Sequence, residues 1–176
     1  MILAPKVAPA QLSMADEDIV GAALRPGFGP NPAAWRLNIT RDRVLRQEVR
    51  IWKCPVEEHR SEQVELRPEE IGTILSTAER IGFRNFPDSY EHKVTDQETL
   101  TIALRLSDGL KTVEAYAPMW LAACENNSDT TNFLELWACI HQRAPFPSAY
   151  NDPQRIVAVL RNQRLTVTVA GLGGGS

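Results

Sequence analysis

The sequence predicts an α+β fold in which a mostly antiparallel sheet of four to six strands packs against two helices. One observation is the helical pattern in residues 68–82, where apolar side chains recur every three or four positions. Another is the hairpin pattern in residues 100–116, where two alternating segments flank the turn sequence Ser-Asp-Gly. A third is the alternation of apolar and polar side chains in residues 35–39, which is typical of a half-buried strand.

The chain is predicted to form one domain. Its 176 residues suffice for a domain with a hydrophobic core, and 43% hydrophobic with 23% charged residues is the composition of a folded protein. We assign residues 1–15 to a flexible N-terminal arm and residues 16–170 to the domain. The glycine-rich residues 171–176 are interpreted as a flexible tail, linker or tag remnant.

The N-terminal half is expected to supply the first strands. Residues 19–24 suit either a short strand or a helical turn, and residues 26–32 form a loop because they include three prolines and two glycines. Residues 35–39 place Trp, Leu and Ile on one face of a strand. A second, irregular strand is expected at residues 44–53 and a short third strand at residues 63–66.

Both ends of the helix at residues 68–82 are marked in the sequence. Pro68 suits the first helical position, and the acidic Glu69 and Glu70 complement the positive end of the helix dipole. Gly82 supplies the left-handed residue that often follows a helix. The apolar stripe that we expect to pack against the sheet consists of Ile71, Ile74, Leu75, Ala78 and Ile81.

A polar loop at residues 83–96 precedes the predicted hairpin. Its strands are expected at residues 100–106 and 111–116, and Gly109 allows the turn because glycine adopts positive φ without strain. Pro118 is expected to end the second strand, since proline cannot donate a ladder hydrogen bond.

A second helix is expected from about residue 128 to residue 143. Asn127 or Ser128 would cap its start, and Pro145 and Pro147 would stop it. Its apolar stripe consists of Phe133, Leu136, Trp137 and Ile140.

The C-terminal residues allow two interpretations. Residues 153–162 suit either a helix or a strand, and we favour a hairpin of residues 156–160 with residues 165–169. In the last segment Leu165, Val167 and Val169 alternate with threonines, which is a good strand pattern. An unpaired strand of this kind would promote aggregation, so we expect it to pair within the chain or with another copy in a homo-oligomer.

Several functions are disfavoured by the sequence. The net charge is −3, whereas a general nucleic-acid-binding protein has a basic surface. No apolar run reaches the ~18 residues that a membrane span needs. The N-terminus lacks the apolar core of a signal peptide, which fits a cytoplasmic protein or one exported after removal of a leader. Motifs for phosphate binding, zinc proteolysis, serine hydrolysis and calcium binding are absent, so we predict no catalytic residues and no cofactor.

The cysteines and histidines follow no metal-ligand spacing, so no metal site is predicted. Cys124 and Cys139 would be able to form a disulfide in an exported protein, a question that the sequence leaves open. A rival hypothesis is a small hydrolase or transferase in which Cys54 or Cys139 is the nucleophile and a histidine such as His59 is the base.

Tryptophan supplies a further alternative. Trp35, Trp52 and Trp137 lie in apolar strand or helix patterns and are predicted to belong to the core. If they lined a cavity instead, the protein would be a small-ligand carrier with an aromatic-lined cavity. Trp120 follows the hairpin and has no such packing explanation.

The candidate partner-binding residues lie in and beyond the polar loop. Capping, turn formation and burial explain most neighbouring positions, but they do not explain residues 88–97. We therefore predict that Tyr90, His92 and Asp96 of this loop, together with Trp120, contact a protein partner.

One part of the chain resembles a known family. The resemblance rests on IGTILSTAERIGFRNF followed by Pro87 in residues 71–87, Asp96, LTIA in residues 100–103, and DG with KTV in residues 108–113. These features are similar to those of small bacterial α+β domains and, among named families, of the emfourin-type proteinase inhibitors. The resemblance implies a compact module that binds a metalloproteinase through its surface. The chain differs in its longer N-terminal part and after Pro118, so no inhibitory residue is carried over.

The sequence thus predicts a non-enzymatic protein-interaction module, with proteinase inhibition as one specific form. Its alternatives are the cysteine-dependent enzyme and the small-ligand carrier.

Overall fold

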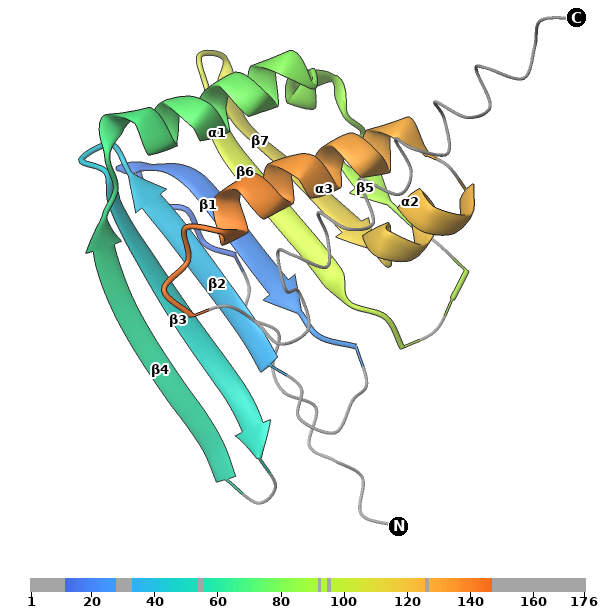
Figure 1. Cartoon of the computed structure of the whole chain (residues 1–176), viewed down its shortest axis with the longest axis horizontal. Coiled ribbons are helices and arrows are strands. Elements are labelled where there is room, and N and C mark those ends of the chain that lie inside the picture. The colour runs from blue at the N-terminus through green and yellow to red at the C-terminus, as the bar shows by residue number, and fades with distance from the viewer. Residues whose placement is uncertain are drawn as a thin grey trace, which may run out of the picture.

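The computed structural model describes most of the chain between Leu12 and Phe146. The described residues are 12–27, 33–53, 56–91, 93–94, 96–125 and 127–146. Their strands form one twisted sheet, and the longest helices lie side by side across one of its faces (Figure 1). The opposite face carries no helix within the described residues.

Seven strands lie in the spatial order β4-β3-β2-β1-β6-β7-β5. They are β1 (Asp18–Arg25), β2 (Ala33–Thr40), β3 (Val44–Lys53), β4 (Val56–Glu65), β5 (Ser89–Tyr90), β6 (Thr99–Leu106) and β7 (Gly109–Tyr116). The helices are α1 (Pro68–Arg80), the short 3-10 helix η1 (Phe83–Asn85), α2 (Pro118–Glu125) and α3 (Ser128–His141). Neighbouring strands are antiparallel except β5 and β7, which are parallel.

The α+β class is confirmed, but the sheet is larger than the sequence predicts. The prediction gives four to six strands and two helices, whereas the described residues contain seven strands and three α-helices. β4 accounts for part of the difference, because the prediction places only a short strand at residues 63–66. Nearly all its side chains are exposed, so it lacks the apolar alternation that reveals a strand. Continuous pairing with β3 supplies its structure instead.

The sequence does not predict helix α2 or strand β5. Pro118 ends strand β7, as expected, but it is also the first residue of α2, where the missing N–H costs no hydrogen bond. Ala117 precedes it with a φ of 50°, a left-handed turn that no sequence pattern announces. β5 has only two residues and lies within the predicted polar loop.

The core lies between the sheet and the helices. On β2, Trp35, Leu37 and Ile39 face the helices and are at most 1% exposed, as their alternation predicts. Equivalent buried residues on the neighbouring strands are Val20, Ala22, Leu24, Leu100, Ile102 and Leu104. The helices contribute Ile74, Phe133, Leu136, Trp137 and Ile140. Burial of each large apolar side chain contributes about 1.5–3 kcal/mol, so this face supplies most of the stability.

Helix α1 departs from its prediction at one position. Ile71, Ile74 and Ala78 are buried, but Leu75 is 38% exposed and does not belong to the packed stripe. The helix ends at Arg80, and Gly82 follows with a φ of 69°, which confirms the predicted left-handed residue.

The starts of α1 and α3 carry side-chain caps. The Asn127 side chain accepts hydrogen bonds from the backbone N–H groups of Asp129 and Thr130, at 3.0 and 3.1 Å, which confirms the predicted start of α3. At α1, the Glu70 carboxylate accepts a hydrogen bond from the Arg67 backbone N–H at 2.9 Å. This bond and the neighbouring Arg67 guanidinium hold the pKa of Glu70 below its ordinary value.

Some predictions concern residues outside those described. They are the structure of residues 153–162, the hairpin formed with residues 165–169, and the positions of Cys54 and His92.

Candidate functional site: a groove on the open face of the sheet

The face of the sheet opposite the helices is lined by small side chains. In the register of β1, β6 and β7, Ala23 pairs with Thr101, which pairs with Glu114. The next row contains Gly21 and Ala103. These alternate with the buried core residues of the same strands, so they project to the open side. The surface of the sheet therefore lies close to the strand backbones here, and we call this part of it the floor.

A segment that precedes β1 crosses this floor. A Cβ atom added at Gly21 would lie 2.3 Å from the Met14 sulfur and 3.1 Å from Leu12 Cδ1. The absence of a side chain at Gly21 thus lets Leu12 and Met14 rest directly on the sheet. Ala23, two positions further along the same face of β1, is only 4% exposed.

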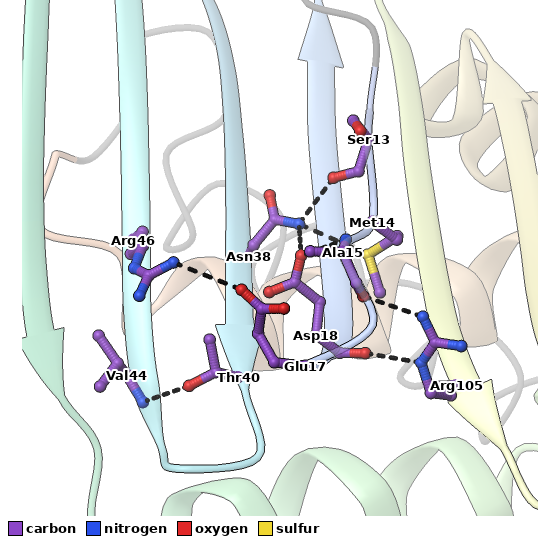
Figure 2. Close-up of polar contacts among 10 residues, drawn as sticks. All are labelled: Ser13, Met14, Ala15, Glu17, Asp18, Asn38, Thr40, Val44, Arg46 and Arg105. Atoms are coloured by element: carbon purple, nitrogen blue, oxygen red, sulfur yellow. Dashed lines mark hydrogen bonds and ion pairs between the residues drawn. The ribbon is translucent and has the colours of Figure 1, made fainter.

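Asp18 holds the segment of residues 12–15 in place through hydrogen bonds, as Figure 2 shows. Its carboxylate Oδ2 accepts hydrogen bonds from the Ala15 backbone N–H at 2.8 Å and from the Asn38 side-chain amide at 2.6 Å. The Asn38 amide also donates to the Ser13 carbonyl at 2.8 Å. Asp18 is 4% exposed, so its charge is stabilised by these hydrogen bonds rather than by water.

Arg105 of β6 holds the segment from the other side. Its guanidinium donates to the backbone carbonyls of Asp18 at 3.0 Å and Ala15 at 2.9 Å (Figure 2). Glu17 lies 4.0 Å from Arg46 of β3, a contact that contributes little at the surface. Because β1, β2 and β6 all supply anchors, the segment has a fixed position across the open face.

The space beside this fixed segment is a groove of about 520 Å³, which we call the sheet groove. The residues that line it are Leu12, Met14, Ala23, Arg25, Thr99, Thr101, Ala103, Leu110, Thr112 and Glu114. Leu12 and Met14 form one wall, and the side chains of β7 form another. Its volume falls in the range of ligand and side-chain pockets.

The groove combines apolar and polar groups. Leu110 of β7 lines it and is 49% exposed. Arg25 Nη2 lies 3.6 Å from Glu114 Oε1 and donates to Thr99 Oγ1 at 3.0 Å. Both charged side chains are half exposed, so they are available to an incoming polar group. The groove offers an apolar surface next to one cation and one anion.

The predicted partner-binding residues that the structure describes do not line the sheet groove. Tyr90 is on β5, where its ring contacts Phe86 and its hydroxyl donates to Asp129 of α3 over 3.4 Å. Partial burial and the Asp129 carboxylate raise the pKa of Tyr90 well above its usual range. Asp96 lies in the loop before β6 with a φ of 63°, and Trp120 on α2 is 48% exposed. His92 is outside the described residues.

Cys139 of the rival enzyme hypothesis and the neighbouring His141 both lie on α3 and differ in burial. Cys139 is partly exposed, and its sulfur lies 3.5 Å from Arg143 Nη1. His141 is 1% exposed and stacks on Trp35 with ring centres 5.0 Å apart. Trp35 also contacts Trp137 at 5.0 Å, so the predicted assignment of these two tryptophans to the core is confirmed.

In the described part of the chain, no three His, Cys, Asp or Glu side chains come together in a way that would hold a metal ion. None of the helices described is both long and apolar enough to cross a bilayer.

Comparison with known proteins adds no assignment. No protein-family model matches the chain, and no curated protein matches it at a significant level. The similarity to emfourin-type inhibitors therefore stays a prediction from the sequence.

Sequence reasoning missed the sheet groove because each lining residue is ordinary by itself. A signal is nevertheless present: Gly21, Ala23, Thr101 and Ala103 are small residues at alternate positions of two strands. It becomes informative only when the register of β1 and β6 is known, since these strands are far apart in the sequence.

Proposed function

We propose that the protein is a non-enzymatic protein-interaction module whose sheet groove receives one or two apolar side chains of a partner. The observation that supports this proposal is the exposed Leu110, which lines the sheet groove beside its floor of small residues. Protein interfaces concentrate their binding energy in such places, where an anchoring side chain fills a pocket and is shielded from water.

The position of the groove favours a protein over a small molecule. It lies on the outer face of the sheet, so it would leave much of a small ligand in contact with water, whereas small-molecule sites bury most of the ligand. A protein partner covers the groove and its rim together. Trp120 on α2 and the loop with Asp96 are retained as a proposed second contact region.

The test is site-specific photo-crosslinking in cells of the source organism. A photoreactive residue at position 110 should form an adduct of defined mass, and Thr101→Phe in the same chain should abolish it by filling the groove. Position 75 is the matched control, because Leu75 is a similarly exposed leucine on α1. Equal adducts from both positions, or an adduct that survives Thr101→Phe in a folded protein, would contradict the proposal.

Proteinase inhibition is the specific form suggested by the family resemblance. Titration of a purified bacterial metalloproteinase with the protein should then give stoichiometric loss of peptidase activity. Unchanged activity at a large excess would remove this form and leave the general interaction proposal standing.

A second candidate is the small-ligand carrier, favoured by the indole groups of Trp35 and Trp137. Both Nε1 atoms are buried and have no hydrogen-bond acceptor among the described residues. An unpaired buried donor costs about 1–3 kcal/mol, so a bound molecule with an acceptor atom would stabilise this region. Native mass spectrometry of freshly purified protein should show a retained ligand; a mass equal to that of the chain alone would count against it.

A further inference from the structure

The segment of residues 12–15 shows how the open face of the sheet holds an extended chain. Its alternate apolar side chains lie on Gly21 of β1. Two of its backbone carbonyls accept hydrogen bonds from side chains of the sheet, one from Asn38 of β2 at 2.8 Å and one from Arg105 of β6 at 2.9 Å (Figure 2). This face therefore binds a chain through every second side chain and through side-chain hydrogen bonds to its backbone.

The sheet groove follows β6 beside this segment and has the dimensions of one more extended chain. Its lining begins at Thr99 of β6 and reaches Leu110 of β7, which pairs with Arg105. Residues 99–105 of a strand span roughly 20 Å, the length of about six extended residues. β1 and β7 flank β6 and are roughly 10 Å apart, whereas a helix with its side chains is about 10–12 Å wide. The shape therefore favours an extended segment over a helix.

The floor determines which side chains such a segment would carry. Thr101 and Ala103 lie two positions apart on β6 and both line the groove. Side chains that alternate along an extended partner segment have the same spacing, so two of them would lie on these two residues in turn. Apolar side chains are favoured, because Met14 and Leu110 offer apolar surface on the two sides.

One end of the groove holds an arginine with unused donors. Arg25 donates, within the described residues, a single hydrogen bond, to Thr99 Oγ1 at 3.0 Å, and this bond holds it against the floor. Its contact with Glu114 is longer, at 3.6 Å, and both side chains are 50% exposed. A guanidinium has five N–H donors and binds a carboxylate best through two parallel hydrogen bonds. The charge at this end therefore favours an acidic group.

We propose that the sheet groove binds an extended segment of a partner protein, with apolar side chains at alternate positions and a carboxylate at the end next to Arg25. This inference rests on the proposed function, because it names the kind of segment that the groove receives. The apolar side chains lie on Thr101 and Ala103, and the carboxylate accepts the unused donors of Arg25.

Selection of random heptapeptides displayed on phage against the full chain tests the shape of the segment. The enriched peptides should carry apolar residues at alternate positions and an acidic residue near one end. They should not bind Thr101→Phe, in which the new ring fills the floor. Enrichment of apolar residues spaced three or four apart, which is the helical pattern, would overturn the proposal, and so would enrichment of basic peptides.

The role of Arg25 is tested by exchanging charges. In fluorescence polarisation, Arg25→Glu should weaken binding of an enriched acidic peptide by about tenfold or more. The same variant should bind more tightly than wild type to the peptide in which lysine replaces the acidic residue. Arg36→Glu is the matched control, because Arg36 is an exposed arginine on the same face that pairs with Glu48 outside the groove. Equal affinities of wild type and Arg25→Glu for both peptides would overturn the proposed carboxylate contact.

These results are distinguishable from failure of the proposed function itself. Photo-crosslinking at position 110 reports whether any protein occupies the groove, whatever its conformation. An adduct at position 110 combined with a selection that enriches no peptide would overturn the extended segment and leave the interaction module standing. Absence of the adduct would overturn both.

Discussion

The two faces of the sheet carry very different side chains although they alternate along the same strands. Facing the helices, β1 and β6 present large residues such as Leu24 and Ile102, which are fully buried. Facing the open side, the same strands present Gly21, Ala23 and Ala103. Large residues fill the space beneath the helices, whereas small residues leave space above the sheet. The segment from Leu12 to Ala15 occupies only part of that space, and the remainder is the sheet groove.

The faces also differ in what holds their covering elements. Helices α1 and α3 are held by apolar burial, at about 1.5–3 kcal/mol for each large side chain. The segment on the open face is held mainly by four hydrogen bonds that converge on Asp18 and Arg105, each with a net contribution of about 1.5–3 kcal/mol because one partner is charged. The covered face should therefore respond to mutation with global unfolding, and the open face with smaller, local effects.

The largest effect is expected from Ile74→Asp on the covered face. Ile74 is fully buried, and a carboxylate there would lie without a partner in the core, at a cost of about 4 kcal/mol or more. Circular dichroism and urea denaturation should show loss of the cooperative transition. Leu75→Asp is the matched control and should fold, because Leu75 is 38% exposed on the same helix. A cooperative Ile74→Asp variant would show that α1 is not packed on the sheet as described.

A smaller effect is expected from Asp18→Ala on the open face. The change leaves the Ala15 N–H and the Asn38 amide without their acceptor and should lower the free energy of unfolding by about 1–3 kcal/mol. Asp18→Asn retains an acceptor oxygen and should cost less. Urea denaturation measures the difference, and hydrogen exchange should show the loosening confined to residues 13–18. Wild-type stability in Asp18→Ala would contradict the anchoring role.

The covered face is also the part that the sequence predicts well. Burial on one side of an element leaves a periodic pattern of apolar residues in the sequence. One continuous segment is therefore enough to predict the strand that contains Trp35, helix α1 or the β6–β7 hairpin. The open face and β4 leave no such pattern, because small or charged residues satisfy a solvent-facing strand equally well. The groove requires the register of Ala23 with Thr101, which is a long-range property. Pro118 shows a further limit, because one residue both ends β7 and starts α2.

Two glycines sharpen the contrast further. Gly72 lies in α1 with nothing within 4 Å of an added Cβ, so Gly72→Ala should stabilise the protein by about 0.5–1 kcal/mol through helix propensity. Gly21→Ala should act in the opposite direction, because the new methyl group would displace Met14 and disturb the wall of the groove. Thermal denaturation of the pair measures both signs. Two stabilising substitutions would show that Met14 does not rest on Gly21.

The smallest effect concerns the charge at the start of α1. The pKa of Glu70 is lowered in the folded state by the hydrogen bond from the Arg67 N–H and by the guanidinium. A lowered folded pKa means that the stabilisation is present above the unfolded value of about 4.3 and is lost as the pH falls through the folded value. Glu70→Gln should therefore be less stable than wild type at pH 7, and the difference should shrink toward pH 3. Because the carboxylate is at the surface, high salt should reduce the difference as well. A difference that is constant with pH would mean that the hydrogen bond alone, without the charge, caps this helix, and would make the start of α1 resemble the uncharged Asn127 cap of α3.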